Sequence, residues 1–526
     1  MTNASSSLKE RLSALPPAVL SGLKRGIEKE SLRVRPDGAL ALTAHPAALG
    51  SALKHPHITT DFSEALIELI TGVHARVEAC REELKHIHQF AYRHIGDEVL
   101  WGASMPCSLP DEKAIPIARY GNSNVGRAKT VYRIGLAHRY GKRMQMIAGL
   151  HYNWSLPEAA WPLAGFRDTN EAYFALVRNF RRHAWLLLYL FGASPAVCAS
   201  FVAGRKHALE ELAPGTLYLP HATSLRMGRL GYLSEAQDSL AVSYNSIESY
   251  TGCLDEVLTK PYPPYEAIGI RDGERAASGG VEDYRQLATS LLQIENEFYS
   301  TIRPKRVIRP GERPLHALRE RGVEYVEVRA MDLDPFSPIG ITADTIRFLD
   351  VFLLHCLLAD SPPDTRREIE TIGRNKLRAA ARGREPGLRL DRDGKMVELR
   401  EWGAEVLAEC APIAASLDAA QGTGAHREAL SAAVKATEDP NRLPSARVLA
   451  EMRERHENSY ARFALALSLE HAKTLRSEPL PAEVEARFAR LAEESIRKQK
   501  EIEAAERVDF ETYRQKYLSP ESLRVQ

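Results

Sequence analysis

The apolar residues in the first two thirds of the chain follow two different periods. The run IEKESLRV at residues 27–34 fits a strand, and stretches in which polar and apolar side chains alternate occur at Met146–Leu156, Leu291–Phe298 and Glu324–Ala330. Alternation of this kind is typical of a β-strand with one polar face and one face on a core. We therefore predict a strand at each of these four places.

Other stretches carry apolar residues at the period of an α-helix. Ser63 is a favoured N-cap residue, and the sequence after it predicts a short helix over Glu64–Ile70, with Glu64 and Glu68 on one face. Longer helices are predicted at Glu78–His94, Arg127–Tyr140, Glu171–Leu190 and Glu235–Val257.

One apolar segment is long enough to raise the alternative of a membrane span. Ala184–Ala203 contains 20 residues without a charge, and about 20 apolar residues are what a helix needs to cross a bilayer. Gly192 and Pro195 interrupt the segment near its middle, where a helix end and a turn are expected. We therefore predict a buried helix over Phe180–Phe191, then a turn and a second apolar element.

The last third of the chain has a different character. From about residue 365 it is rich in charged residues and alanine, with a mostly helical pattern that breaks at 422–424 and 479–481. The last predicted helix, Ala482–Tyr517, is dense in Glu, Arg and Lys, which is typical of a helix with a solvated face. We therefore divide the chain into a domain over residues 10–375 and a helical C-terminal extension, residues 376–526, packed on it.

Composition and charge narrow the classes of function. The net charge is only +1, which gives no indication of a nucleic-acid or anionic-membrane surface. Met1–Leu20 lacks the basic start and apolar core of a secretory signal. The cysteines show no C-x-x-C spacing, so we expect neither a disulfide framework nor a thiolate zinc site, and a reducing cytoplasm fits. They are Cys80, Cys107, Cys198, Cys253, Cys356 and Cys410.

The predicted strands carry chemically capable side chains two residues apart. Glu28 and Glu30 project from one face of their strand, because successive side chains alternate. The same spacing recurs in His151 and Asn153, in Glu295 and Glu297, and in Glu327 and Arg329. Carboxylates with one imidazole make a site for a hard cation such as Mg²⁺ or Mn²⁺. This pattern points to phosphoryl chemistry.

Several longer motifs lie in one order between about residues 20 and 345. They are ITTDFSEALIELIT (58–71), YGNSNVGR (120–127), GLHYNWSLP (149–157), LFGASPA (190–196), ATSLR (222–226), IENEFYSTIRPKR (294–306) and EYVEVR (324–329). Together they closely resemble the proteobacterial glutamate–cysteine ligases. The resemblance covers the domain over 10–375, which it implies to be catalytic, whereas the C-terminal third matches only in general helical character.

The resemblance implies an α+β fold of the glutamine-synthetase-like carboxylate–amine ligases, with a curved antiparallel sheet, helices on its outer side and the site in its concave face. The alternating pattern of the predicted site strands agrees with an antiparallel sheet. The implied reaction joins the γ-carboxylate of L-glutamate to L-cysteine with ATP, through an acyl phosphate. The implied metal ligands, shared among two or three Mg²⁺ ions, are Glu28, Glu30, Asp61, Glu68, His151 and Glu327.

Substrate contacts are expected from positive, polar and apolar side chains. Arg226 and Arg329 suit the carboxylates of two amino acids, because a guanidinium can clamp a carboxylate with two parallel bonds. Arg133 and Arg329 are the candidate catalytic residues, and Arg133, Arg303 and Lys305 the candidate phosphate partners. Gln145, Asn153 and Tyr299 are candidate polar contacts. By resemblance, the cysteine side chain lies among Phe62, Tyr132, Leu136 and Tyr232.

Two alternatives stay open at this point. A ligase on the same scaffold that joins glutamate to another amine would share the metal ligands and differ in the four residues of the cysteine pocket. A non-catalytic helical scaffold would turn over no ATP even with Mg²⁺. The resemblance further implies a monomer, and inhibition by glutathione in competition with glutamate. From the charge balance we expect neither membrane nor nucleic-acid partners.

Overall fold

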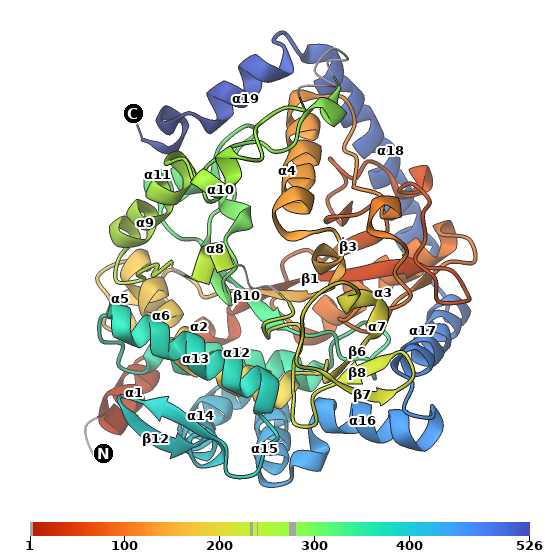
Figure 1. The fold of residues 1–526 in the computed structure, drawn as a ribbon. Helices are drawn as coiled ribbons and strands as arrows, with labels where there is room; N and C mark the ends of the chain where they lie inside the picture. The colour runs from red at the N-terminus through yellow and green to blue at the C-terminus, as the bar shows by residue number, and fades with distance from the viewer. Residues whose placement is uncertain (1–3, 232–234, 239, 273–279, 526) are drawn as a thin grey trace.

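The structure is a computed structural model that describes residues 4–231, 235–238, 240–272 and 280–525. Within these residues, the centre is an antiparallel sheet of seven strands in the order β2-β3-β1-β5-β10-β9, with β4 paired to β1 (Figure 1). The strands are β1 (Lys24–Val34), β2 (Ile58–Thr60), β3 (Leu66–Ile70), β4 (Val99–Leu100), β5 (Leu150–Ser155), β9 (Ile302–Lys305) and β10 (Tyr325–Met331). The prediction of a mixed helix and sheet protein with antiparallel pairing is confirmed, as are strands at 27–34, within 146–156 and near 324–330.

The helix predicted over Glu64–Ile70 is wrong. Residues 66–70 form β3, which pairs with β1 on one side and β2 on the other. A run of seven mostly apolar residues fits either period, and strand pairing on both sides decides between them. Glu64 lies outside the strand, where its carboxylate accepts hydrogen bonds from the backbone N–H groups of His45 and Arg119.

The strand predicted over Leu291–Phe298 is also wrong, because Glu295–Glu297 form the short 3-10 helix η5. Both carboxylates are buried and paired away from the polar face of the sheet. Glu295 holds Arg313, with 2.8 Å between Oε2 and Nη2, and Glu297 holds Arg139, with 2.9 Å between Oε1 and Nη1. The two glutamates at this spacing therefore form two buried ion pairs and are not part of a common polar strand face.

Helices back the apolar face of the sheet. They include α3 (Val77–His94) and α6 (Thr169–Phe191), each close to its predicted range, and α12 (Ala343–Leu358), for which no helix was predicted. A buried ion pair joins the sheet to α12, since Arg25 contacts Asp350 at 3.0 Å, and Asp350 also accepts a 2.6 Å hydrogen bond from the Tyr152 hydroxyl.

The segment after α6 follows the sequence prediction. The chain turns at Gly192 and continues into β6 (Ala196–Cys198) and α7 (Ala199–Val202); β6 pairs in a small sheet with β8 (Thr216–Tyr218), which also pairs with β7 (Glu210–Ala213). The apolar residues of α6 are buried against other parts of the chain. Among the described residues, no helix is long and apolar enough to cross a membrane.

The polar face of the sheet is covered by α4 (Asn124–Tyr140), which Ser123 caps through the N–H of Gly126. Beyond it lie α8 (Glu235–Asp238), α9 (Ile247–Thr259), α10 (Pro263–Glu266) and α11 (Pro314–Arg321). The single helix predicted over Glu235–Val257 is thus two helices. Short helices elsewhere in the domain are α1 (Ala4–Ser13), α2 (Pro17–Ser21) and α5 (Ala160–Leu163).

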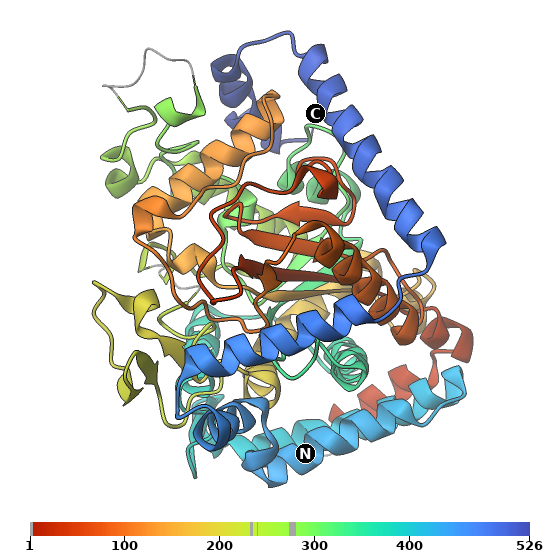
Figure 2. The ribbon, with the colours of Figure 1, turned by 90° about the vertical axis from the view of Figure 1, so that its right-hand side faces the viewer.

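The C-terminal third is helical, as predicted, apart from a hairpin of β11 (Arg389–Arg392) and β12 (Lys395–Glu398). Its helices are α13 (Arg366–Arg382), α14 (Leu399–Gln421), α15 (Ala425–Glu438), α16 (Pro444–Arg455), α17 (Tyr460–Ser477), α18 (Ala482–Ala505) and α19 (Phe510–Leu518). Figure 2 shows α18 running along one side of the molecule. The boundary expected at 375 falls inside α13, so the two parts share a helix.

The last predicted helix and the state of the cysteines both differ from expectation. The helix predicted over Ala482–Tyr517 is broken, because α18 ends at Ala505 and Asp509 caps α19 through the N–H of Thr512. The cysteines also include one bonded pair, Cys107 and Cys198, whose Cα atoms lie 5.2 Å apart. The fold brings these residues together from distant parts of the sequence, which spacing rules cannot detect.

Candidate active site

A cavity of about 460 Å³ lies between the polar face of the central sheet and α4. Strands, loops and helices from the whole chain contribute to its wall, from Glu28 to Tyr517. All six predicted metal ligands line it: Glu28, Glu30, Asp61, Glu68, His151 and Glu327. The sequence prediction that these distant side chains share one cavity therefore agrees with the structure.

Strand register brings the ligands together. Glu28 on β1 is directly opposite His151 on β5, and Glu30 is opposite Glu68 on β3. Side chains paired across antiparallel strands project to the same face. Glu327 on β10 joins this face from the other side of β5, where it is opposite Asn153.

His151 stands between two groups of carboxylates. Its Nδ1 lies 3.4 Å from Oε2 of Glu28 and 3.8 Å from Oε1 of Glu327, and its Nε2 lies 3.9 Å from Oε1 of Glu30. Ligand atoms of Glu28, His151 and Glu327 all lie within 4.8 Å of one another, and so do those of Glu30, Glu68 and His151. Two sets of three ligands thus share one imidazole.

Asp61 lies at the rim of this arrangement, just after β2. Its side chain is 43% exposed, and its Oδ1 lies 3.6 Å from Nη2 of Arg133. It belongs to neither set of three, although it lines the same cavity.

The acidic residues are crowded enough to shift one another's pKa. Burial and the charge of Asp61 raise the pKa of Glu30 to about 8, against the pull of Arg226. Burial, together with Glu28 and Glu30, raises the pKa of Glu68 well above its ordinary value. Crowded carboxylates with raised pKa values are stabilised in their charged form by a nearby cation.

The pKa of Glu327 is shifted in the opposite direction, downward. Although burial opposes ionisation, Lys305 at 3.6 Å and Arg329 at 3.2 Å hold its pKa well below the ordinary value. Both cations approach Oε1, while the buried Oε2 has no hydrogen-bond partner. Glu327 is therefore a carboxylate that stays charged and has one oxygen available to a ligand.

One face of α4 lines the cavity opposite the sheet. Val125, Ala128, Lys129, Tyr132, Arg133 and Leu136 lie there at helical spacing. Among the other predicted contacts, Gln145, Tyr299, Arg303, Lys305 and Arg329 also line the cavity. The amide of Gln145 donates to the Tyr299 hydroxyl at 3.1 Å.

Three predicted substrate contacts do not line this cavity, and a fourth, Tyr232, lies outside the described residues. Phe62 is fully buried in the main core. Asn153 donates its amide to Glu28 at 2.8 Å. Arg226 is buried and donates to the carbonyl of Arg329 at 3.0 Å, while its guanidinium packs so closely on Gly149 that a Cβ there would lie 2.2 Å from Nη2.

Several cavity residues were not predicted. Lys129 could have been found, since it lies one helical turn before Arg133 on the predicted helix. Ile70 was assigned to a helix and so was not placed beside the metal ligands. Tyr513 and Tyr517 come from α19, and no sequence signal connects that charged region with the sheet.

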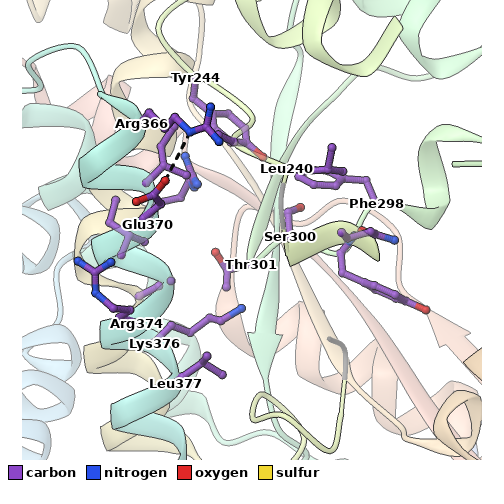
Figure 3. Close-up of a pocket in the computed structure, with 18 residues that line it drawn as sticks. Leu240, Tyr244, Phe298, Ser300, Thr301, Arg366, Glu370, Arg374, Lys376 and Leu377 are labelled. Atoms are coloured by element: carbon purple, nitrogen blue, oxygen red, sulfur yellow. Dashed lines mark hydrogen bonds and ion pairs between the residues drawn. The ribbon is translucent and has the colours of Figure 1, made fainter. Parts of the chain in front are cut away.

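A second cavity, of about 390 Å³, lies between α13 and residues 298–301 (Figure 3). Its α13 wall carries Arg366, which pairs with Glu370 at 3.4 Å, and also Arg374 and Lys376. Tyr299 lines both cavities. None of the six predicted metal ligands, all of which are described, lines this second cavity, so we place the candidate active site in the first.

An antiparallel sheet that gathers carboxylates and an imidazole beside guanidinium and ammonium groups suits an enzyme that handles phosphate and carboxylate groups. The class is that of the ATP-dependent ligases. More narrowly, the chain belongs to the glutamate–cysteine ligase family, because the model of that family matches residues 10–379.

Curated relatives and solved structures agree with this family. The chain is 51% identical to the glutamate–cysteine ligase of Pseudomonas fluorescens over 506 residues, covering 94% of this chain and 93% of that one. It is 52% identical to the enzyme of Azotobacter vinelandii, covering 93% of each. A crystal structure of glutamate–cysteine ligase from Francisella tularensis in complex with AMP is 36% identical, with a TM-score of 0.89 over 94% of this chain and 97% of that one.

A more distant structure shows the same fold. It is a bifunctional glutathione synthetase from Pasteurella multocida, with 23% identity and a TM-score of 0.66, covering 92% of this chain and 57% of that one.

Proposed function

We propose that the protein joins the γ-carboxylate of L-glutamate to the amino group of L-cysteine with ATP, giving γ-glutamylcysteine, ADP and phosphate, the first step of glutathione synthesis. The observation that carries this proposal is the single cavity in which two sets of metal ligands lie beside Arg303, Lys305 and Arg329. Family membership supports the identity of the substrates.

The scaffold we propose is the curved sheet of the glutamine-synthetase-like ligases, with the site in its concave face. Ile70 and Lys305 belong to strands four places apart in the sheet order, yet both line the same cavity. Strong curvature would bring such strands within reach of one ligand. The catalytic part comprises residues 10–375, with residues 376–526 packed on it.

The donor set fits hard divalent cations. It consists of carboxylate oxygens and one imidazole, with the unpartnered Oε2 of Glu327 among them. We assign one Mg²⁺ to the carboxylates of Glu28 and Glu327 and another to those of Glu30 and Glu68. His151 would ligate one of these ions through its single lone pair and donate its N–H to the other group, and Asp61 is available to a third ion; Mn²⁺ would fit the same oxygens. When bound, such ions neutralise phosphate charge and polarise phosphoryl oxygens.

The cationic side chains of the cavity would hold the reacting groups in line. We assign Arg303, Lys305 and Arg133, which all line the cavity, to the ATP phosphates. Burial would lower the pKa of Arg133, but Tyr120 and Asp61 raise it, so its charge is retained. A glutamate carboxylate oxygen attacks the γ-phosphorus and ADP leaves. The neutral cysteine amine then attacks the acyl carbon, the bond from that carbon to the phosphate oxygen breaks, and the proton lost from nitrogen leaves with the phosphate.

Binding of the two amino acids is assigned to the other wall of the cavity. Arg329 suits a substrate carboxylate, and Gln145 with Tyr299 supplies polar contacts. Tyr132 and Leu136 form an apolar surface for the cysteine side chain, with Phe62 and Tyr232 as further candidates. Asn153 and Arg226 do not line the cavity, and they would act by holding Glu28 and the β10 backbone in place.

A coupled assay of ADP release tests the proposal. Turnover should require Mg²⁺, ATP, glutamate and an amine together, with cysteine preferred and 2-aminobutyrate accepted because the pocket is apolar. Preference for a diamine would favour a different ligase on this scaffold. No ATP turnover under any of these conditions would favour the non-catalytic scaffold and overturn the proposal.

The remaining expectations are tested separately. Glutathione should inhibit, and excess glutamate should relieve the inhibition. Light scattering should show a monomer, and cell fractionation should find the protein in the cytoplasm, with neither membranes nor nucleic acid as partners.

A further inference from the structure

The C-terminal helix α19 contributes two aromatic side chains to the wall of the candidate active site. Tyr513 and Tyr517 both line the cavity. They lie four residues apart on one face of the helix, with ring centres 5.7 Å apart and ring planes only 9° from parallel. α19 thus contributes two stacked aromatic rings to a space that is otherwise built from the first 330 residues.

The helix is firmly attached beside the cavity. Phe510 is buried with Ala128 and Val131 of α4 and with Leu287, and the Arg514 side chain donates to the Leu287 carbonyl at 2.6 Å. These contacts fix α19 at the N-terminal half of α4, as Figure 1 shows.

The connection that precedes α19 is also held to α4. Glu506 accepts hydrogen bonds from the backbone N–H of Asn124 at 2.9 Å and from the Asn124 side-chain amide at 2.6 Å. The carbonyl of Val508 accepts another from that amide at 2.9 Å. The position of α19 therefore follows from specific polar contacts at the start of α4 as well as from apolar packing.

A buried ion pair joins α19 to the loop that follows β9. Arg313 pairs with Glu295 through two nitrogens, donates from Nη1 to the Tyr517 carbonyl at 2.8 Å and lies 4.8 Å from the Tyr517 ring centre. Ile308 and Gly311 of this loop, and Pro314 at the start of α11, line the same cavity. Tyr517 thereby holds the loop as well as facing the ligand space.

We propose that α19 is the outer wall of the ATP site, with Tyr513 and Tyr517 contacting the nucleotide. This inference rests on the proposed function. The loop that α19 holds follows directly from Arg303 and Lys305, the residues assigned to the phosphates, whereas Gln145 and Arg329, assigned to the amino acids, belong to other parts of the wall. A planar base stacks well on aromatic rings, so the parallel pair suits the base of ATP better than an amino-acid substrate.

The test uses variants of the full chain. We expect Tyr513→Ala and Tyr517→Ala each to raise the KM for ATP about 10-fold, since base stacking on an aromatic ring contributes on that order. The KM values for glutamate and cysteine should change less than twofold. Tyr513→Phe should retain wild-type values because the ring remains. Lys516→Ala, an exposed position on the same helix, is the matched control.

Two further measurements keep the outcome clear. Calorimetric titration with a non-hydrolysable ATP analogue should show the same 10-fold loss, which separates binding from turnover, and melting curves should show that the variants are folded. An unchanged ATP affinity, or a larger effect on either amino acid, would overturn the inference. A wild-type protein that binds the analogue but ligates nothing would instead overturn the proposed function.

Discussion

Glu28 and His151 face each other across strands β1 and β5, with 3.4 Å between Oε2 and Nδ1. The other imidazole nitrogen faces Glu30. A single side chain therefore joins two acidic groups that would otherwise repel each other, and it does so without a positive charge, because burial and Arg329 lower its pKa. A neutral imidazole has one lone pair, so one of its nitrogens can bind a cation while the N–H of the other donates to a carboxylate of the neighbouring set.

Because there are two sets of carboxylates, we predict that substitutions in one set remove one metal ion and substitutions in the other set remove the other. Glu327→Gln should remove one Mn²⁺ ion and Glu68→Gln the other, while His151→Asn should weaken both, because the imidazole can ligate one ion and orient a carboxylate of the other set through its N–H. Each change should lower ligase activity by about 100-fold. Electron paramagnetic resonance titration with Mn²⁺ counts the ions, and the ADP-release assay gives the activity.

The matched control for these variants is Glu324→Gln. Glu324 lies just before β10 and pairs with Arg306 at 3.6 Å outside the cavity. It should leave the ion count and the activity unchanged. If Glu327→Gln and Glu68→Gln removed the same ion, the assignment of two separate sets would be wrong.

Arg329 is predicted to depend on its guanidinium shape as well as on its charge. Its Nη1 contacts Oε1 of Glu327 at 3.2 Å and approaches Nδ1 of His151 at 3.5 Å, while the side chain still lines the cavity. Arg329→Lys keeps the charge but loses the planar fork, so we expect kcat/KM for glutamate to fall about 10–100-fold. Arg306→Lys, just after β9 and away from the cavity, should change it little, and an equal loss in both variants would refute the assignment.

A stability prediction follows from the buried pair of Arg25 and Asp350. Neither side chain is exposed, and Asp350 also accepts the Tyr152 hydroxyl. Asp350→Ala should lower the free energy of unfolding by about 3–5 kcal/mol, because it leaves a buried guanidinium charge without its partner. Urea denaturation of this variant beside Asp360→Ala, whose carboxylate is about half exposed, measures the difference; a loss below 1 kcal/mol would contradict it.

Much of the site could be predicted because its ligands follow strand alternation. Glu28 and Glu30 are two residues apart on one strand, and this pattern gives their common face without any tertiary information. Glu295 and Glu297 show the same spacing, yet each is neutralised by a distant arginine. Local spacing cannot distinguish a metal-ligating carboxylate from one in a buried ion pair, because the arginine that pairs with the carboxylate lies elsewhere in the sequence. For the same reason Tyr513 and Tyr517 could not be placed.

The last prediction concerns pH and the junction of α14 with α15. Gly424 precedes α15 and offers no capping side chain, but the buried carboxylate of Asp418 accepts from the backbone N–H groups of His426 at 2.9 Å and Arg427 at 3.1 Å. Burial opposes ionisation, but these N–H groups and the two side chains lower the pKa of Asp418 to about 2. Its unfolded pKa is near 3.8, so the stabilisation is present above about pH 4 and is lost as pH falls toward 2.

Asp418→Asn should therefore lower the free energy of unfolding by about 1–2 kcal/mol at pH 7, because the charged acceptor of several hydrogen bonds is lost. The gap between wild type and variant should narrow as pH falls below 4, since protonation removes the same charge from the wild type. Urea denaturation followed by circular dichroism at pH 7, 4 and 3 measures it. Asp393→Asn, at an exposed turn position, is the control and should have the same free energy of unfolding as the wild type at each pH. If the difference between wild type and Asp418→Asn stayed constant from pH 7 to pH 3, the ionised carboxylate would not be the source of the stability.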